Sequence, residues 1–104
     1  MPIKFEPAAL VRLDEITRYT KERWGREQAR RYSDGLFAAI DGILDNTTVS
    51  RPISAKFGMR GFFFRYERHY VYWQRLRKGD IGIVTILHER MHQLDRFRDD
   101  TRPQ

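Results

Sequence analysis

Cysteine is absent from the 104-residue chain. Disulfide bonds, thiolate metal sites and a cysteine nucleophile are therefore excluded. Long apolar runs are missing as well, and no stretch is long enough for a transmembrane helix. The segment Met1 to Glu6 lacks the apolar core of a signal peptide. We therefore expect a cytoplasmic protein that makes no membrane contact.

The common catalytic fingerprints are also missing. The sequence contains no G-x-S-x-G nucleophile elbow, no P-loop and no dinucleotide-binding glycine motif. Asp14 and Glu15 are adjacent on a predicted helix, so they do not face each other and are expected to be ordinary solvated charges. We predict no cofactor, no metal and no self-sufficient catalysis, and we expect a protein that works by binding a macromolecule.

Positive charge is in excess. Lys and Arg total 20 against 14 Asp and Glu, which gives a net charge of +6, and most of the cations are arginine. This balance favours an acidic partner, either nucleic acid or an acidic protein, because long-range attraction raises the local concentration of such a partner. The alternative is that the charge only keeps a small protein soluble.

Hydrophobic periodicity predicts a strand followed by a helix at the start of the chain. Apolar and charged residues alternate over residues 3–6, which indicates a short strand. An amphipathic helix is expected from about Pro7 to Arg23, because proline is favourable in a first helical turn. The predicted apolar face of this helix holds Leu10, Leu13, Ile16, Thr17, Thr20 and Trp24.

Gly25 interrupts the pattern, and a second helix is expected from Arg26, so that the two form a helical hairpin locked at its junction by Trp24. The predicted inner face of the second helix holds Ala29, Tyr32, Leu36, Ile40, Ile43 and Leu44. Glycine inside a helix costs roughly 1 kcal/mol relative to alanine. Gly35 and Gly42 therefore indicate a close approach of the first helix or of a partner, unless they are simply tolerated on the surface.

The second half of the chain has the period-two pattern of strands. After a loop over residues 48–58, strands are predicted at 61–66, 69–76 and 81–87, and glycine in the 77–80 turn favours a hairpin. One or two helical turns are expected within residues 89–97. The predicted fold class is therefore α+β, with the order β-α-α-β-β-β and a short C-terminal helix. One domain is expected at residues 1–98, in which the helical hairpin covers a small antiparallel sheet. Residues 99–104 are expected to be a flexible tail.

Residues 88–92 match the H-E-x-x-H pattern of zinc proteases. That chemistry requires both histidines on one helical turn, a third ligand elsewhere and a substrate cleft. Here His88 falls where a strand is predicted to end, and no histidine or glutamate follows His92. We therefore predict that the match is incidental.

Four segments together resemble the ParE branch of the RelE/ParE toxin superfamily. Residues 19–29 read Y-T-K-E-R-W-G-R-E-Q-A and residues 58–60 read G-M-R. Residues 69–73 read H-Y-V-Y-W and residues 86–91 read I-L-H-E-R-M. The resemblance implies a helical hairpin on an antiparallel sheet. It also implies a toxin that inhibits DNA gyrase by trapping cleaved DNA. A ParD-type antitoxin would neutralise it in a hetero-oligomer.

The resemblance leaves an alternative, the RelE branch, which cleaves messenger RNA on the ribosome. The RelE-type lysine positions correspond to Gly61 and Phe63 in this chain, a RelE-type arginine position corresponds to Tyr70, and only Arg90 matches. Such cleavage needs proton-transfer groups and cations at the phosphate. An alternative set that could replace the missing cations is Lys56, Arg60, Arg75 and His88, and the ribonuclease candidates are Arg90, His88 and Arg60. A third hypothesis is a non-toxic interaction or nucleic-acid-binding module.

Candidate contact residues follow from these hypotheses. The candidates for target binding are Arg60, Arg65, His88, Arg90 and Met91. The candidates for antitoxin binding are Leu13, Ile16, Tyr32, Leu36 and Ile40. Tyr70, Tyr72 and Trp73 are expected to pack within the sheet, because aromatic residues favour strands, although they would suit base stacking if nucleic acid bound directly. We do not expect direct nucleic-acid binding.

Overall fold

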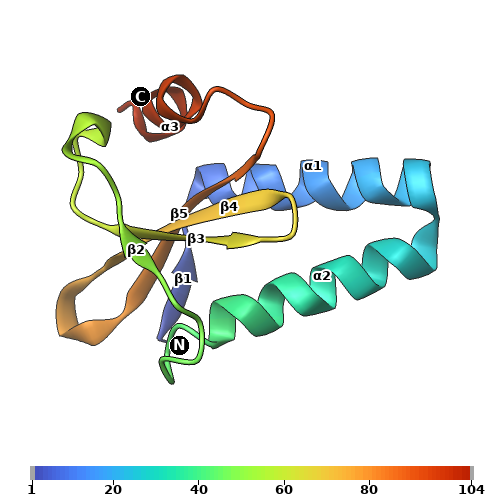
Figure 1. Ribbon diagram of the computed structural model, residues 1–104, viewed down its shortest axis with the longest axis horizontal. Helices are drawn as coiled ribbons and strands as arrows, with labels where there is room; N and C mark the ends of the chain where they lie inside the picture. Colours follow the sequence, from blue (N-terminus) through green and yellow to red (C-terminus); the bar gives the residue numbers. More distant parts are fainter. Residues whose placement is uncertain (1, 104) are drawn as a thin grey trace.

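The computed structural model describes residues 2–103, and it has three α-helices and five strands in that range (Figure 1). The helices are α1 (Pro7–Trp24), α2 (Arg26–Asp41) and α3 (Gln93–Thr101). The strands are β1 (Ile3–Phe5), β2 (Arg51–Pro52), β3 (Phe62–Tyr66), β4 (His69–Arg75) and β5 (Ile81–His88). Two 3₁₀ turns, η1 (Ala55–Phe57) and η2 (Arg77–Gly79), complete the chain. The predicted α+β class and element order are confirmed.

The hairpin of α1 and α2 turns on a single residue. Pro7 occupies the first turn of α1, where its missing N–H costs nothing. Gly25 has φ 96°, a value that residues with a side chain rarely adopt, and its N–H bonds to the Lys21 carbonyl at 2.9 Å. The chain therefore reverses between the two helices with one intervening residue, as the Trp-Gly junction predicts.

The sheet has the strand order β1-β5-β4-β3-β2. All neighbouring strands are antiparallel except β1 and β5, which run parallel with Ile3 opposite Ile81. The sheet is therefore mixed, whereas the sequence analysis expected it to be antiparallel. The difference arises because β1 joins the edge next to the last strand, where Ile3 and Phe5 pack against the core. β2 is a short edge strand inside the predicted loop.

The two faces of the sheet bury different side chains. The face under the helical hairpin is mostly aliphatic, and its buried residues include Leu36, Ile40, Val71, Ile83 and Ile86. The opposite face lies under α3 and η1 and is rich in aromatic rings. There Phe97 is fully buried, and its ring centroid lies 5.1 Å from that of Tyr72 and 5.0 Å from that of Phe57.

The buried stripe of α1 differs from the predicted one. The residues that face the sheet are Ala9, Leu13, Ile16 and Thr20, whereas Leu10, Thr17 and Trp24 are exposed. The two sets share Leu13, Ile16 and Thr20, and they differ because Ala9 is buried whereas Leu10, Thr17 and Trp24 are not. The closer packing of Ala9, which is fully buried, selects the observed set.

Two further expectations are corrected. Residues 99–101 belong to α3, so the predicted tail at 99–104 begins too early. Gln104 lies outside the described residues. Gly35 approaches the sheet, because a Cβ at this position would overlap the Tyr66 hydroxyl of β3, and not the first helix or a partner.

Candidate functional site

An open groove of about 1010 Å³ lies where the helical hairpin diverges from the sheet. One wall comes from the second half of α1 and the first half of α2. The other wall comes from the β3–β4 turn, the end of β5 and the segment leading into α3. The lining residues that carry the argument below are Ile16, Tyr19, Trp24, Arg31, Tyr32, His69, Ile86, His88, Arg90, Met91 and Arg96.

The apolar part of the groove continues the hairpin core. Ile16 and Ile86 are buried there, and Tyr32 is half-buried beside them. Tyr19 and Trp24 extend the apolar wall toward the hairpin turn, where they are 58% and 66% exposed. Large exposed aromatic side chains along a groove are typical of a partner site, because they offer a large apolar area.

A chain of ring contacts crosses the inner end of the groove. The Tyr32 hydroxyl lies 2.5 Å from Nδ1 of His69, and the His69 and His88 rings meet edge-on with centroids 5.0 Å apart. Burial, with a smaller contribution from the neighbouring His88, lowers the pKa of His69 to about 4. Burial also raises the pKa of Tyr32 to about 12. Both groups are therefore neutral at physiological pH, which suits an apolar partner surface.

The rim of the groove is basic. It carries five arginines, against two glutamates: Arg12, Arg31, Arg68, Arg90 and Arg96 against Glu15 and Glu67. Arg68 is paired with Glu89 at 3.2 Å. Within residues 2–103, the side chains of Arg31, Arg90 and Arg96 form no ion pair. These three guanidinium groups can therefore bind acidic groups of a partner.

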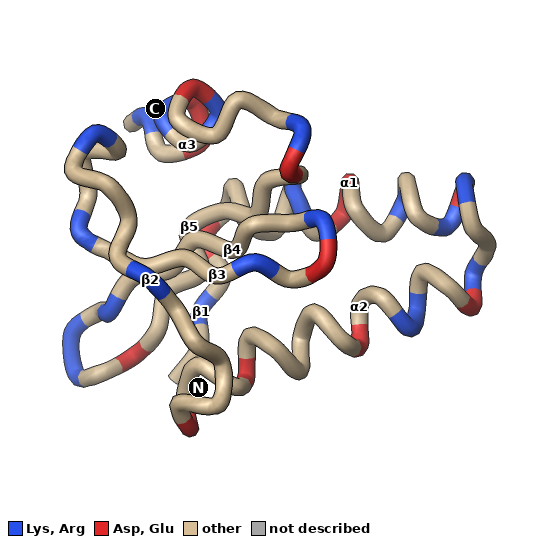
Figure 2. The backbone as a smooth tube through the Cα atoms, in the orientation of Figure 1, with Lys and Arg blue, Asp and Glu red and all other residues tan. Residues whose placement is uncertain are grey.

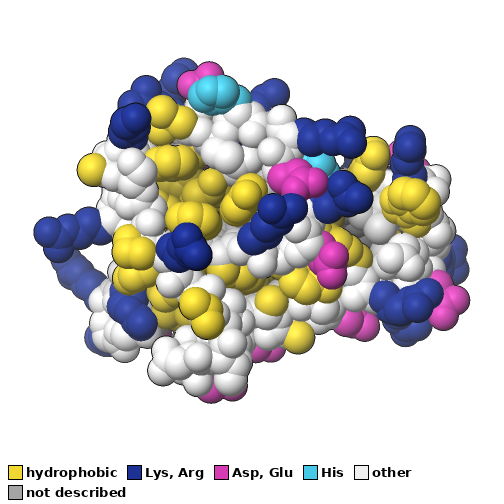
Figure 3. All heavy atoms as spheres, in the orientation of Figure 1, with side chains coloured by type: hydrophobic (Ala, Val, Ile, Leu, Met, Phe, Trp, Pro, Cys, Tyr) yellow, Lys and Arg dark blue, Asp and Glu magenta, His cyan; other side chains and the backbone are white. Residues whose placement is uncertain are grey.

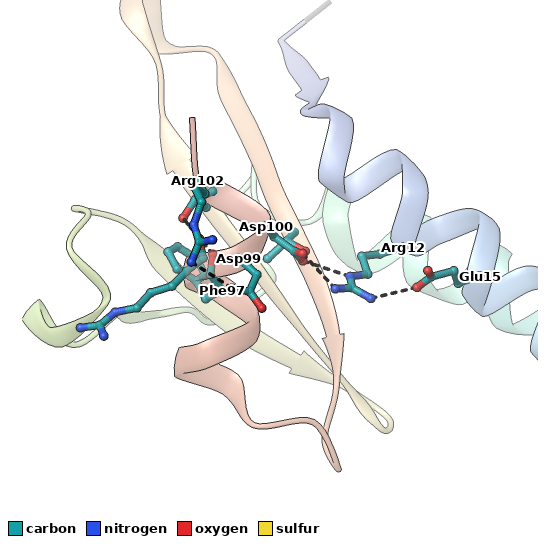
Figure 4. A network of polar contacts seen from close by, with 9 residues as sticks. Arg12, Glu15, Phe97, Asp99, Asp100 and Arg102 are labelled. Carbon is teal, nitrogen blue, oxygen red and sulfur yellow. Dashed lines mark hydrogen bonds and ion pairs between the residues drawn. The ribbon is translucent and has the colours of Figure 1, made fainter. Parts of the chain in front are cut away.

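Arg12 has a structural role at the edge of the groove (Figure 4). Its Nε and Nη2 donate to the two carboxylate oxygens of Asp100 at 3.0 and 2.9 Å, and its Nη1 donates to Glu15 at 3.0 Å. The hydrogen bond to Asp100 is the main reason that the pKa of Arg12 is raised. Asp100 also accepts a hydrogen bond of 2.7 Å from the buried Thr85 hydroxyl. One carboxylate of α3 thus joins α1 to β5.

The predicted target-binding residues do not form one surface. His88, Arg90 and Met91 line the groove, and Met91 also packs on the aromatic core under α3. Arg65 lies on β3 and is paired with Glu89, while its Nε donates to the Glu67 carbonyl at 2.8 Å. Arg60 is exposed in the segment after η1 and does not line the groove.

The predicted antitoxin-binding residues divide by burial. Tyr32 and the edge of Ile16 line the groove, and Leu13 is partly buried beside the core. Leu36 and Ile40 are each 1% exposed, so they cannot contact a partner while the core is packed. Their apolar spacing indicated the inner face of the helix correctly, but that face is covered by the protein's own sheet.

Trp24 is the main site residue that the sequence analysis placed wrongly. It was assigned to the helix junction, yet it is exposed and lines the groove, with the Arg23 guanidinium 5.8 Å from its ring centroid. Tyr19 and Arg31 were not considered. Each lies three or four residues from another groove residue on the same helix, which places them on one face of that helix. This spacing became informative only once the buried residues of α1 were known.

The H-E-x-x-H match is not built as a zinc site. His88 ends β5, and its Nδ1 accepts the Arg90 N–H at 3.0 Å. His92 precedes α3 as its N-cap, and its Nδ1 accepts the Asp95 N–H at 3.3 Å. The two histidines therefore lie on different elements and do not share a helical turn, as their sequence context predicts.

A smaller cleft of about 380 Å³ lies on the other face of the sheet, beside η1 and α3. Figure 3 shows hydrophobic side chains gathered in this region with Lys and Arg around them. The cleft is lined mainly by Ile53, Phe57, Phe63, Tyr70 and Tyr72. Tyr72 and Trp73 are 4% exposed, so the expectation that they pack within the sheet is confirmed.

The fold and the groove define a class of small α+β proteins whose open groove has a basic rim and a partly apolar lining. The sequence-family model described as ParE toxin of type II toxin–antitoxin system, parDE, matches residues 3–93 of this chain. Toxin ParE1 of Mycobacterium tuberculosis is 34% identical over 87 residues, which cover 82% of this chain and 86% of the relative.

Two further relatives are also ParE toxins. Toxin ParE of Escherichia coli is 34% identical over 85 residues, covering 81% of each chain. Toxin ParE1 of Caulobacter vibrioides is 30% identical over 94 residues, covering 88% of this chain and 92% of the relative. The chain belongs to the ParE toxin family of type II toxin–antitoxin systems, and the family implies an antitoxin partner. Within residues 2–103, no helix is both long and apolar enough to cross a membrane.

Proposed function

We propose that this ParE-family toxin inhibits DNA gyrase by trapping it on cleaved DNA, and that a ParD-type antitoxin neutralises it by occupying the groove. The observation that carries the proposal is the groove itself, with its exposed Tyr19 and Trp24 and its unpaired rim arginines. Membership of the family supplies the gyrase target and the type of antitoxin as expectations.

The groove favours an amphipathic, acidic antitoxin segment. The apolar part of the groove offers the edge of Ile16, the half-buried Tyr32 ring and the exposed Tyr19 and Trp24 to hydrophobic side chains. The rim offers Arg31, Arg90 and Arg96 to carboxylates. A segment with hydrophobic residues on one side and acidic residues on the other would satisfy both, in the way that an amphipathic helix fills a hydrophobic groove.

Inhibition of gyrase is better supported than messenger RNA cleavage. The ribonuclease candidates His88 and Arg90 line the groove, but Arg60 does not, so the three do not surround one substrate position in this structure. General acid–base chemistry requires its groups within hydrogen-bond reach of one reacting position.

The test is a gyrase reaction with purified toxin, scored both for supercoiling and for cleaved DNA. We expect loss of supercoiling and accumulation of cleaved DNA, and we expect equimolar ParD-type antitoxin to prevent both. A parallel reaction contains translating ribosomes and messenger RNA. Toxin-dependent RNA cleavage there, without an effect on gyrase, would replace this proposal with the ribonuclease alternative.

A further inference from the structure

Positive charge gathers at the turn of the helical hairpin, which projects away from the sheet, and also at the opposite end of the molecule (Figure 2). Residues 18–31 carry six Lys and Arg against two Glu, whereas residues 32–50 carry three Asp and no cation. Only Arg18 among the six is in an ion pair within residues 2–103, with Asp14 at 2.6 Å. We call residues 18–31 the hairpin tip.

Helix stability does not explain this distribution. A helix favours acidic side chains near its N-terminus and basic ones near its C-terminus, with typical effects of about 0.3–1 kcal/mol per charge. Lys21 and Arg23 in the last turn of α1 follow this rule. In α2 the rule is followed only by Glu27 in the first turn, because Arg26 lies in the same turn, Arg30 follows in the next, and Asp41 ends the helix. The helix dipole therefore does not account for the cations of α2.

We propose that the hairpin tip is a docking surface for the phosphate backbone of double-stranded DNA. Lys21, Arg26 and Arg30 are exposed, and their side chains form no hydrogen bond or ion pair within residues 2–103. They lie on both sides of the turn, so their charges are spread over a convex surface. Lys and Arg in such an arrangement bind phosphates and release counterions.

Duplex DNA fits this surface better than a single strand does. Proteins that bind single strands combine a channel along the backbone with aromatic rings that stack on the bases. The aromatic residues of the tip, Tyr19 and Trp24, instead line the groove, to which Lys21, Arg26 and Arg30 do not contribute. The DNA-docking cations and the groove are therefore separate, and an antitoxin in the groove leaves these three cations free.

The experiment measures binding of the full-length toxin, without gyrase or antitoxin, to a fluorescent DNA duplex over a range of salt concentrations. The test variant carries Lys21→Gln, Arg26→Gln and Arg30→Gln. The matched control carries Arg51→Gln, Arg77→Gln and Lys78→Gln, which replace exposed cations far from the tip. Both variants lose three positive charges from the net +6, so total charge cannot distinguish them.

We expect the tip variant to bind at least about tenfold more weakly and its salt dependence to fall by roughly two to three phosphate contacts, while the control stays within about twofold of the parent. Equal weakening of both variants, or no duplex binding by the parent at low salt, would overturn the proposal. Tip-dependent binding that is tighter for single-stranded RNA than for the duplex would also overturn it. Because gyrase is absent, these outcomes are independent of the proposed target.

Discussion

The base and the tip of the helical hairpin share two helices but differ in what surrounds them. At the base, Leu36 and Ile40 are 1% exposed and Ala9 is fully buried against the sheet. At the tip, Trp24 and Tyr19 stand mostly in solvent. The same amphipathic pattern thus covers the sheet at one end of the hairpin and leaves an open groove at the other.

This difference separates stability from recognition. Most of the free energy of hydrophobic burial comes from side chains removed from water, which in the hairpin means its base. The exposed aromatic side chains of the tip contribute little to folding, and they line a groove in a protein whose family implies a partner. We therefore expect substitutions at the base to change folding and substitutions in the groove to change binding.

The largest effect is expected from Leu36→Ala. Removing a fully buried leucine leaves a cavity and should lower the free energy of unfolding by about 2–5 kcal/mol. Trp24→Ala in the groove should change it by less than about 0.5 kcal/mol, because surface substitutions rarely do more. Chemical denaturation of both variants checks the comparison. A larger loss for Trp24→Ala would show that the tip is part of the core.

The next largest effect is expected from Asp100→Ala, which acts at the base. The substitution leaves the Arg12 guanidinium and the Thr85 hydroxyl without their acceptor, at a cost of about 1.5–3 kcal/mol for hydrogen bonds to a charged group. The control is Asp99→Ala, whose carboxylate pairs with Arg102 in solvent and should contribute less than about 1 kcal/mol. Equal melting temperatures for the two variants would contradict the assignment.

A comparable or smaller effect is expected from Gly35→Ala. Alanine normally stabilises a helix relative to glycine, but here its methyl group would overlap the Tyr66 hydroxyl. We expect a net loss of about 1–3 kcal/mol from overpacking. Adding Tyr66→Phe removes the overlapping oxygen and should recover part of the loss. A rise in thermal stability for Gly35→Ala alone would place Gly35 outside the close contact.

The last comparison concerns pH at the boundary between base and groove. The pKa of His69 is about 4 in the folded protein and 6.5 as its ordinary value, so the unfolded chain binds a proton first as pH falls. The stability contributed by neutral His69 is present above pH 6.5 and is lost between pH 6.5 and about 4. Of the neighbouring groups, His88 opposes protonation of His69, Glu89 favours it, and Tyr32 stays neutral.

Melting temperature measured against pH tests this expectation. His69→Asn should flatten the decline in that window, while His92→Asn, which replaces an exposed histidine, should leave the decline unchanged. If His69→Asn has the same pH dependence as the parent chain, another group is responsible.

The sequence predicts the base of the hairpin better than the groove. Local signals were sufficient for the helices and the strands, because Pro7, Gly25 and the period-two segment act within a few residues. The predicted apolar face of α1 was too wide, and it included Trp24, which is exposed. Periodicity alone cannot choose between two adjacent stripes, since the choice depends on which side chain fits against β5.

The role of α3 could not be predicted for a different reason. Phe97 and Asp100 contact residues far away in the sequence, namely Phe57, Tyr72, Arg12 and Thr85. The segment that contains them is short and polar, and such a composition is typical of a frayed chain end. The candidate contact residues show the same limit: His88, Arg90 and Met91 are close in sequence and lie together in the groove, whereas Arg60 and Arg65 lie elsewhere.

The most direct test of the account is hydrogen–deuterium exchange of the toxin with and without a ParD-type antitoxin. The account predicts new protection at the edges of the groove, in residues 15–24, 28–32, 66–69 and 86–92. It predicts little change near η1 and the cleft beneath α3. Protection confined to residues 53–63 and 70–72, with the groove still exchanging freely, would contradict the central claim that the groove is where the toxin is neutralised.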